Sequence, residues 1–181
     1  MSTKVYYKES TVKSWIHEII RSMNADGWKP DYIVGLTRGG LVPAVMLSHY
    51  LEVPMHTLKV SLRDDDVGPE SNLWMAEDAF GYQGTLQEDG SFDYADQAKN
   101  ILIVDDINDT GATLNWIKED WSSGCFPSDE RWDNVWGNNV RTAVLINNDA
   151  SNFKDVDYIG LNINKLEEPI WCVFPWEEWW K

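Results

Sequence analysis

The chain has 181 residues, of which 43% are hydrophobic, so we expect residues 1–181 to form a single globular domain with its own core. Acidic residues outnumber basic ones by 30 to 15, which gives a formal net charge of −15. This charge would repel the phosphate backbone of nucleic acids and anionic membrane surfaces, so we expect neither as a partner.

Three features of the sequence predict a cytoplasmic protein. The first ten residues lack the apolar stretch of a signal peptide. No apolar run approaches the length of a membrane span. The two cysteines, Cys125 and Cys172, show neither CxxC nor metal-site spacing, which is typical of reduced thiols in a reducing compartment.

Predicted helices and strands alternate along the chain. The apolar patterns predict helices over 11–24, 41–51 and 112–121, and strands over 32–36, 56–62, 101–104, 141–147 and 157–163. The segment 63–98 is rich in Asp, Glu, Gly and Ser, with only a weak apolar pattern around 73–80. Such alternation predicts an α/β fold with a mostly parallel, doubly wound sheet, in which ligands bind beyond the carboxyl ends of the strands.

The sequence ILIVDDINDTGAT, residues 101–113, joins a buried strand to a helix through an acidic loop. Glycine and small hydroxyl residues at 110–113 would let backbone N–H groups at the helix start bind a phosphate. Three carboxylates precede this phosphate site, those of Asp105, Asp106 and Asp109. Both features fit a sugar phosphate whose hydroxyls face the acids with Mg²⁺ between them, because Mg²⁺ commonly takes carboxylates plus substrate oxygens. An Asp-rich turn that only caps the helix is the alternative.

A second loop, Thr37-Arg38-Gly39-Gly40, follows the strand predicted at 32–36. Paired glycines expose backbone N–H groups, and the Arg38 guanidinium suits a phosphate or pyrophosphate. Since both loops follow strands of one parallel sheet, they predict a two-ended site at one sheet edge, with one end for a polyanion and the other for a sugar phosphate.

These residues resemble a known family. ILIVDDINDTGAT resembles the phosphoribosyl-diphosphate (PRPP) binding signature of type I phosphoribosyltransferases. GLTRGGLVPAVMLSHYL resembles the pyrophosphate loop and following helix of xanthine-guanine and related purine phosphoribosyltransferases, and WCVFPWE at 171–177 resembles a segment near the end of the same subgroup. The resemblance implies transfer of the 5-phosphoribosyl group of PRPP to a nucleobase in nucleotide salvage. The implied base is a 6-oxopurine, that is, guanine, xanthine or hypoxanthine.

The resemblance also implies roles for the acidic loop. Asp105 and Asp106 would hold the ribose hydroxyls and Mg²⁺, with Glu177 near the pyrophosphate and the metal. Asp109 would be the catalytic acid/base group near N7 of the base. The 5′-phosphate would be bound by Thr110, Gly111, Ala112 and Thr113.

The resemblance implies roles for five further positions in binding pyrophosphate and the nucleobase. Thr37, Arg38 and Gly39 would bind pyrophosphate, with the peptide between Thr37 and Arg38 strained or cis. Trp171 would stack on the nucleobase, and the backbone of Cys172 would contact the edge of the base.

Asn147 departs from the family pattern, because purine enzymes of this kind usually place a lysine there, near the 6-oxygen. An asparagine can hydrogen-bond to the base but brings no charge. Two alternatives therefore stay open: transfer to a different base, and a non-catalytic regulator that binds PRPP or a nucleotide. The resemblance further implies a long mobile lid over 63–98, a small C-terminal hood over 164–181, and a homo-oligomer, either dimer or tetramer.

Overall fold

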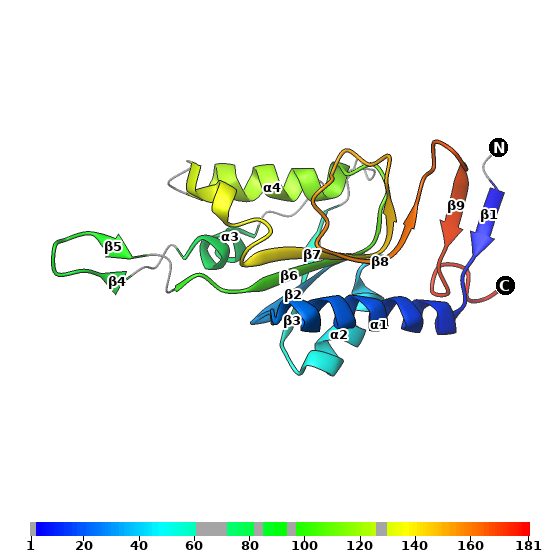
Figure 1. The fold of residues 1–181 in the computed structure, drawn as a ribbon, viewed down its shortest axis with the longest axis horizontal. Helices are drawn as coiled ribbons and strands as arrows, with labels where there is room; N and C mark the ends of the chain where they lie inside the picture. Colours follow the sequence, from blue (N-terminus) through cyan, green and yellow to red (C-terminus); the bar gives the residue numbers. More distant parts are fainter. Residues whose placement is uncertain (1–2, 61–71, 82–84, 94–96, 126–129) are drawn as a thin grey trace.

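Five parallel strands form the central sheet of the protein, in the order β3-β2-β6-β7-β8 (Figure 1). The structure is a computed structural model that describes residues 3–60, 72–81, 85–93, 97–125 and 130–181. The strands of this sheet are β2 (Tyr32–Thr37), β3 (Met55–Lys59), β6 (Ile101–Asn108), β7 (Val140–Asn148) and β8 (Tyr158–Ile163). All four strand pairs are parallel, which confirms the predicted sheet.

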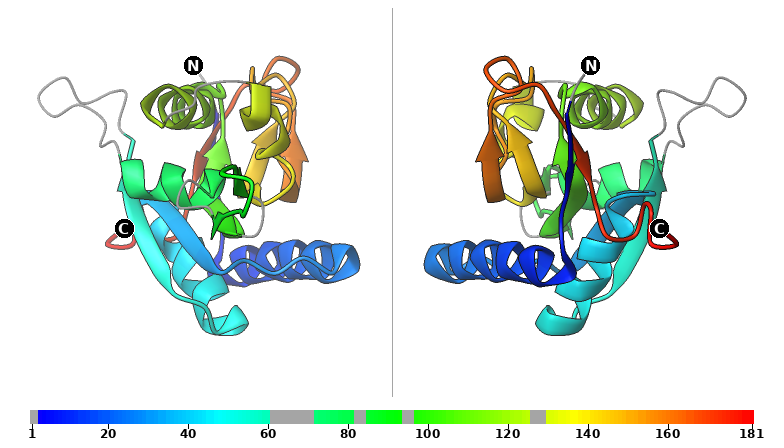
Figure 2. Two further views of the ribbon diagram at one scale, coloured as in Figure 1. Left: turned by 90° about the vertical axis from the view of Figure 1, so that its left-hand side faces the viewer. Right: turned by 90° about the vertical axis from the view of Figure 1, so that its right-hand side faces the viewer.

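Helices cover both faces of this sheet, which explains why its inner strands β2, β6 and β7 are mostly buried apolar runs. The helices are α1 (Glu9–Asp26), α2 (Leu41–Leu51), α3 (Leu73–Phe80) and α4 (Ala112–Gly124). Figure 2 shows α1, in blue, and α4, in yellow-green, on opposite sides of the sheet. Alternate side chains of β6 enter the two cores: Ile101 and Ile103 pack with α3 and α4, whereas Leu102 and Val104 pack with α1 and α2.

The order of the strands reverses between β2 and β6. From β2 the chain moves outward to β3, and it then returns to build β6, β7 and β8 on the other side of β2. The loops that follow β2 and β6 therefore leave the sheet at its topological switch point, where doubly wound folds bind their ligands. This position is where the two predicted phosphate-binding loops lie.

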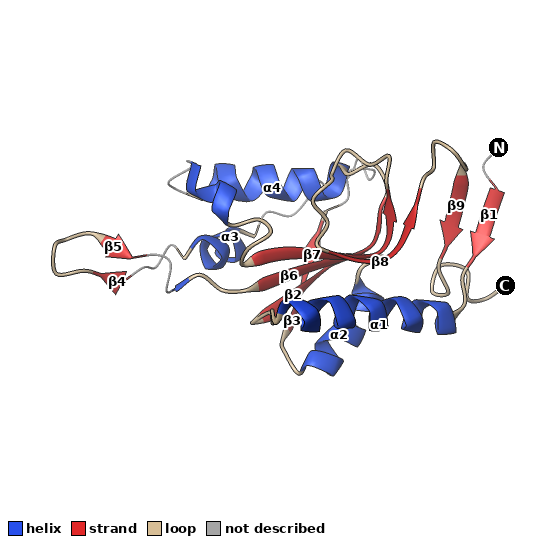
Figure 3. Ribbon diagram, viewed as in Figure 1, coloured by secondary structure: helices blue, strands red, loops and turns tan. Residues whose placement is uncertain are grey.

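A separate pair of parallel strands lies at one end of the molecule (Figure 3). It joins β1 (Thr3–Tyr6) to β9 (Ile170–Val173), so that Val5 pairs with Cys172. The predicted hood, 164–181, contains β9, whereas the sequence patterns did not predict β1. Both chain termini lie beside this pair (Figure 1).

The segment predicted as a lid, 63–98, lies partly outside the described residues and contains one helix. Residues 61–71 lie outside the described residues, so a lid there stays a prediction. Residues 73–80, in contrast, form α3, whose Met75 and Ala79 are buried in the core because they pack against the sheet and α4. The segment therefore contains a buried helix, and a mobile lid within 63–98 stays a prediction.

The described residues also form two short strands and the 3₁₀ helix η2. The strands β4 (Thr85–Leu86) and β5 (Phe92–Asp93) form an antiparallel hairpin at the end of the molecule opposite β1 and β9 (Figure 1). The 3₁₀ helix η2 spans Glu130–Asn134. No helix in the part of the chain that the structure describes is long and apolar enough to cross a membrane.

Candidate functional site

A cleft of about 1040 Å³ lies at the carboxyl ends of the central strands. Both predicted anion-binding loops and the hood contribute to its walls. The predicted site residues that line it are Thr37, Arg38, Gly39, Asp105, Asp106, Asp109, Thr110, Gly111, Ala112, Thr113, Trp171, Cys172 and Glu177. Residues from three distant parts of the sequence thus meet in one cleft.

The loop after β2 packs directly against the acidic end of β6. A Cβ atom on Gly39 would overlap the Asp106 carboxylate, and one on Gly40 would overlap the carbonyl oxygen of Val104. Only glycine allows so close an approach of the two loops. The Thr37–Arg38 peptide bond is cis, in agreement with what the resemblance implies.

The two adjacent aspartates concentrate negative charge at the floor of the cleft. Burial raises the pKa of Asp105 well above its usual range, and the charge of Asp106 raises it further. Burial also raises the pKa of Asp106 to about 6, with a further contribution from the nearby Glu177 carboxylate. This pair of carboxylates therefore favours a bound cation.

Backbone N–H groups orient the two carboxylates, which could together hold a Mg²⁺ ion. Asp105 Oδ1 accepts a hydrogen bond from the Asp106 N–H at 3.0 Å, and Asp106 Oδ1 accepts one from the Ile107 N–H at 2.9 Å. Glu177 Oε2 is instead held by the Phe174 N–H at 2.7 Å. Within the described ranges no three acidic, His or Cys residues form a metal-binding group, so substrate oxygens and water would complete the coordination.

The predicted phosphate loop leads into the first turn of α4. Gly111 is the N-cap residue and has a φ of 85°, a conformation that favours glycine. A Cβ atom there would also overlap the backbone nitrogen of Phe153. The preceding residue, Thr110, accepts a hydrogen bond at its carbonyl oxygen from the Asn152 N–H at 3.0 Å, which holds the two loops close together. The first residues of α4, Ala112 and Thr113, line the cleft, and the N-terminus of a helix suits a phosphate.

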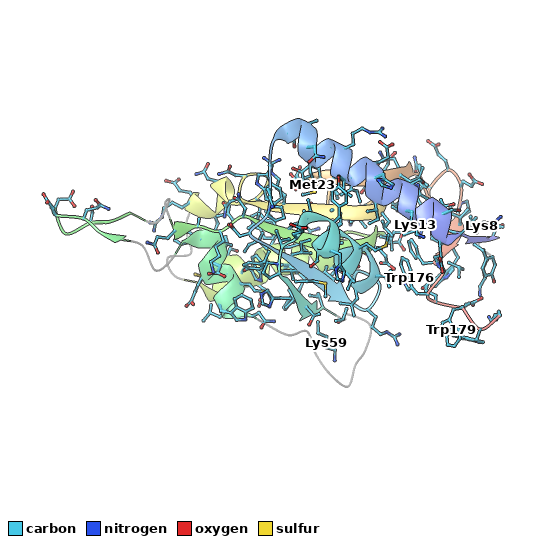
Figure 4. All side chains as sticks on the ribbon, turned by 90° about the horizontal axis from the view of Figure 1, so that it is seen from below. Lys8, Lys13, Met23, Lys59, Trp176 and Trp179 are labelled. Atoms are coloured by element: carbon cyan, nitrogen blue, oxygen red, sulfur yellow. The ribbon has the colours of Figure 1, made fainter. Side chains whose placement is uncertain are left out.

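Two lysines that the sequence analysis missed also line the cleft. Lys165 Nζ forms an ion pair with Asp109 Oδ1 at 2.9 Å. Lys59 is the last residue of β3, next to the loop of Arg38 in the sheet order (Figure 4). The strand predicted over 56–62 places Lys59 in its middle, so the position of Lys59 at a strand end became visible only in the structure. No local signal joins Lys165 to Asp109.

The hood provides the aromatic wall of the cleft. The Trp171 side chain is 50% exposed, whereas Cys172 beside it is 8% exposed. Burial raises the pKa of the Cys172 thiol, so this group stays protonated and serves as a packing surface. Trp176 stacks on Phe174 at 5.0 Å between ring centroids and also borders a smaller cavity with Lys13 and Trp179 (Figure 4).

Comparison with known proteins identifies the family. Residues 3–180 match the model of the phosphoribosyl transferase domain. The chain belongs to the phosphoribosyl transferase family. This assignment confirms the resemblance in the sequence and explains why both phosphate-binding loops belong to one cleft.

Individual relatives of this phosphoribosyltransferase agree with the assignment. The xanthine-guanine phosphoribosyltransferase of Cereibacter sphaeroides is 30% identical over 65% of this chain and 69% of its own length. That of Idiomarina loihiensis is 29% identical over 55% of this chain and 52% of its own length. The crystal structure of a purine phosphoribosyltransferase from Pyrococcus horikoshii has a TM-score of 0.60 and 26% identity, and the match covers 97% of this chain and 94% of that one.

Asn147 is the one predicted site residue that does not line the cleft of this phosphoribosyltransferase. Its side chain belongs to a row of asparagines across three neighbouring strands. Asn108 Nδ2 donates to Asn147 Oδ1 at 2.8 Å, and Asn147 Nδ2 donates to Asn162 Oδ1 at 3.0 Å. The structure thus assigns Asn147 a role in joining the strand ends, and its contact with a base stays a prediction.

Proposed function

We propose that this phosphoribosyltransferase transfers the 5-phosphoribosyl group of PRPP to a 6-oxopurine, which yields a nucleoside monophosphate and pyrophosphate. The observation that carries the proposal is the cleft itself, in which both anion-binding loops face a half-exposed tryptophan, Trp171. One loop suits the pyrophosphate end of PRPP and the other its 5′-phosphate, so the ribose would lie over Asp105 and Asp106. The names of the curated relatives support a purine as the acceptor.

In this reaction the bond from ribose C1 to pyrophosphate breaks, and a bond from C1 to a nitrogen of the base forms. Positive charge develops at C1 as the first bond lengthens, and the carboxylates of Asp105 and Asp106 would stabilise it. Arg38 and Lys59 would stabilise the negative charge on the departing pyrophosphate. A Mg²⁺ ion bound to the acid pair and to substrate oxygens would neutralise further charge on the leaving group.

Asp109 would act as the acid/base group of the reaction. Its carboxylate lines the cleft and is one-third exposed, so a bound base can reach it. In the transfer to the base, Asp109 would accept the proton that the base loses, a contribution of about 10²–10⁴-fold to the rate. The ion pair with Lys165, at 2.9 Å, holds this carboxylate in the cleft.

We infer two further properties. Cys125 and Cys172 are both buried free thiols, which supports the reducing environment of the cytoplasm. Val42, Val45 and Tyr50 expose an apolar face of α2, which supports the expected dimer or tetramer. Sedimentation equilibrium at micromolar concentration tests the latter, and a monomer would remove that inference.

The activity is tested by incubating the protein with PRPP, Mg²⁺ and a panel of purine and pyrimidine bases, while nucleotide and pyrophosphate are quantified. We expect both products in equal amounts with 6-oxopurines. Asp109→Asn should slow turnover about 10²–10⁴-fold and leave PRPP binding, measured by calorimetry, nearly unchanged. Binding of PRPP without conversion of any base would refute the proposed enzyme and leave a PRPP-binding regulator.

A further inference from the structure

The end of β7 packs against the start of the predicted phosphate loop. Asn148, the last residue of β7, donates from Nδ2 to the carbonyl oxygen of Asp109 at 2.8 Å. In the loop that follows, the Asn152 N–H donates to the carbonyl oxygen of Thr110 at 3.0 Å. Asp109 and Thr110 line the cleft, whereas Asn148 and Asn152 do not. Two consecutive carbonyl groups therefore point away from the cleft, toward the end of β7 and its loop.

The direction of these two carbonyl groups fixes the direction of two N–H groups. Both peptide groups are trans and planar, so in each the N–H points opposite to the C=O. The carbonyl of Asp109 shares its peptide group with the N–H of Thr110, and the carbonyl of Thr110 shares its own with the N–H of Gly111. Both N–H groups therefore point to the cleft side, and neither donates to another residue in the described part of the chain. Two such adjacent donors suit a phosphate.

Further hydrogen bonds fix the amide group of Asn148 itself. The side chain is buried, and its Oδ1 accepts from the Ala150 N–H at 3.2 Å and from the Lys165 N–H at 3.0 Å. If the amide were flipped, its NH₂ group would face these two donors and its oxygen would face the carbonyl of Asp109. Only the observed orientation therefore satisfies all three partners, and it directs Nδ2 at Asp109.

A second buried side chain holds the loop after β7 in place. Ser151 Oγ donates to Asn108 Oδ1 at 2.9 Å and accepts from the Phe153 N–H at 3.1 Å. Asn108 Nδ2 in turn donates to the carbonyl oxygen of Phe153 at 3.0 Å. This loop contacts the phosphate loop directly, since a Cβ atom on Gly111 would overlap the backbone nitrogen of Phe153. A buried network with all these partners engaged fixes the position of the loop behind the cleft.

We infer that Asn148 is a positioning residue, which turns the peptide group between Asp109 and Thr110 so that the Thr110 N–H faces the 5′-phosphate. This inference rests on the proposed function. Asn148 does not line the cleft, so it would act only through the backbone of Asp109. The same hydrogen bond would hold the Asp109 carboxylate in place for proton transfer, because the carbonyl and the carboxylate belong to one residue. Asn148 would therefore serve both phosphate binding and turnover.

Binding of the two halves of PRPP tests this inference without turnover. Ribose 5-phosphate would occupy the phosphate loop, and pyrophosphate with Mg²⁺ would occupy the loop of Arg38, so calorimetry with each ligand measures one end of the cleft. Asn148→Ala should lower the affinity for ribose 5-phosphate at least roughly 10-fold, because a hydrogen bond to a charged group loses its geometry. The affinity for pyrophosphate with Mg²⁺ should stay unchanged. A merely structural role of Asn148 would not separate the two ligands.

Asn139→Ala is the matched control, because Asn139 forms a similar bridge at the opposite end of β7. Its Nδ2 donates to the carbonyl oxygens of Ala79 at 2.7 Å and Lys99 at 3.0 Å, and the residue does not line the cleft. This variant should have a lower Tm and should bind both ligands as the wild type does. If Asn148→Ala does not fold, Ser151→Ala, which removes only one hydroxyl behind the loop, should show the same selective loss to a smaller extent.

Kinetics with a 6-oxopurine separate this inference from the proposed function. Asn148→Ala should lower kcat roughly 10- to 100-fold through displacement of Asp109, with the KM for the base nearly unchanged; an unchanged kcat would overturn the link to Asp109. Equal losses of affinity for both ligands, or no change for ribose 5-phosphate, would overturn the positioning role even if the enzyme is active. A wild type that converts no base, combined with the selective loss in Asn148→Ala, would refute the proposed function and support the role of Asn148.

Discussion

Asp106 offers a direct test of the electrostatics of the cleft. Burial raises the pKa of Asp106 from its ordinary value of 3.8 to about 6, so above this pH the folded protein holds a carboxylate that the unfolded chain would hydrate better. Asp106→Asn removes the charge and keeps an oxygen for the Ile107 N–H, which Asp106 Oδ1 accepts at 2.9 Å. At about 1.36 kcal/mol for each pKa unit, the free energy of unfolding would rise by at most about 3 kcal/mol. Because cleft water reaches Asp106, we expect about 1–2 kcal/mol.

The effect of Asp106→Asn depends on pH in a defined direction. The pKa of Asp106 is higher in the folded than in the unfolded state, so the folded wild type binds the extra proton and loses stability as the pH rises from about 4 to about 6. The asparagine side chain does not titrate, and the buried Asp105 is present in both proteins, so the advantage of the variant should grow over this range. Urea denaturation without Mg²⁺ at several pH values measures the difference, and calorimetry should show loss of PRPP binding. A variant less stable than the wild type near neutral pH, or a gain independent of pH, would refute the reasoning.

The remaining predictions concern the walls of the cleft. Gly39→Ala should lower the affinity for PRPP at least about 10-fold, because its Cβ atom would overlap the Asp106 carboxylate, and calorimetry measures the change. In the control, Gly124→Ala, the Cβ atom would lie 3.7 Å from its nearest neighbour, so this variant should bind PRPP as the wild type does. Trp171→Ala should raise the KM for the base about 10- to 100-fold through lost stacking, while its half-exposed position predicts little change in Tm. Asn147→Lys should lower the free energy of unfolding by about 1–3 kcal/mol in urea denaturation, because it breaks the hydrogen bonds of the asparagine row. Unchanged stability would contradict the role of Asn147 in joining the strand ends.

The central sheet was predictable chiefly because its inner strands β2, β6 and β7 are mostly buried. Parallel strands covered by helices become apolar runs such as ILIV at 101–104, and the acidic and glycine-rich loops that follow them are equally visible in the sequence. Short or exposed elements gave no such signal. In β1 three of four residues are exposed, and the hairpin of β4 and β5 has two residues in each strand. Helix α3 has only eight residues, so its apolar pattern was too short to distinguish from a loop.

The site residues were predictable where those that act together are contiguous in the sequence. Asp105, Asp106 and the phosphate loop are contiguous, so the sequence shows them as one motif. The partner of Asp109 is not contiguous with it: Lys165 reaches the cleft because β8 lies two strands away in the sheet and Asn148 holds the following loop. A pairing of this kind depends on tertiary structure alone.

The net charge of −15 does not conflict with a polyanionic substrate. At about 0.1 M salt the Debye length is roughly 10 Å, so most of the surface charge is screened at the cleft. The charges that would act on the substrate are the near ones: Arg38, Lys59 and Lys165 in the walls, with the N–H groups at the start of α4. The acid pair lies between these positive groups, where it would bind Mg²⁺ and the uncharged hydroxyls of the ribose and would avoid the phosphates. The acidic composition is therefore compatible with the site because each end of the substrate meets groups of the opposite charge, whatever the charge of the rest of the surface.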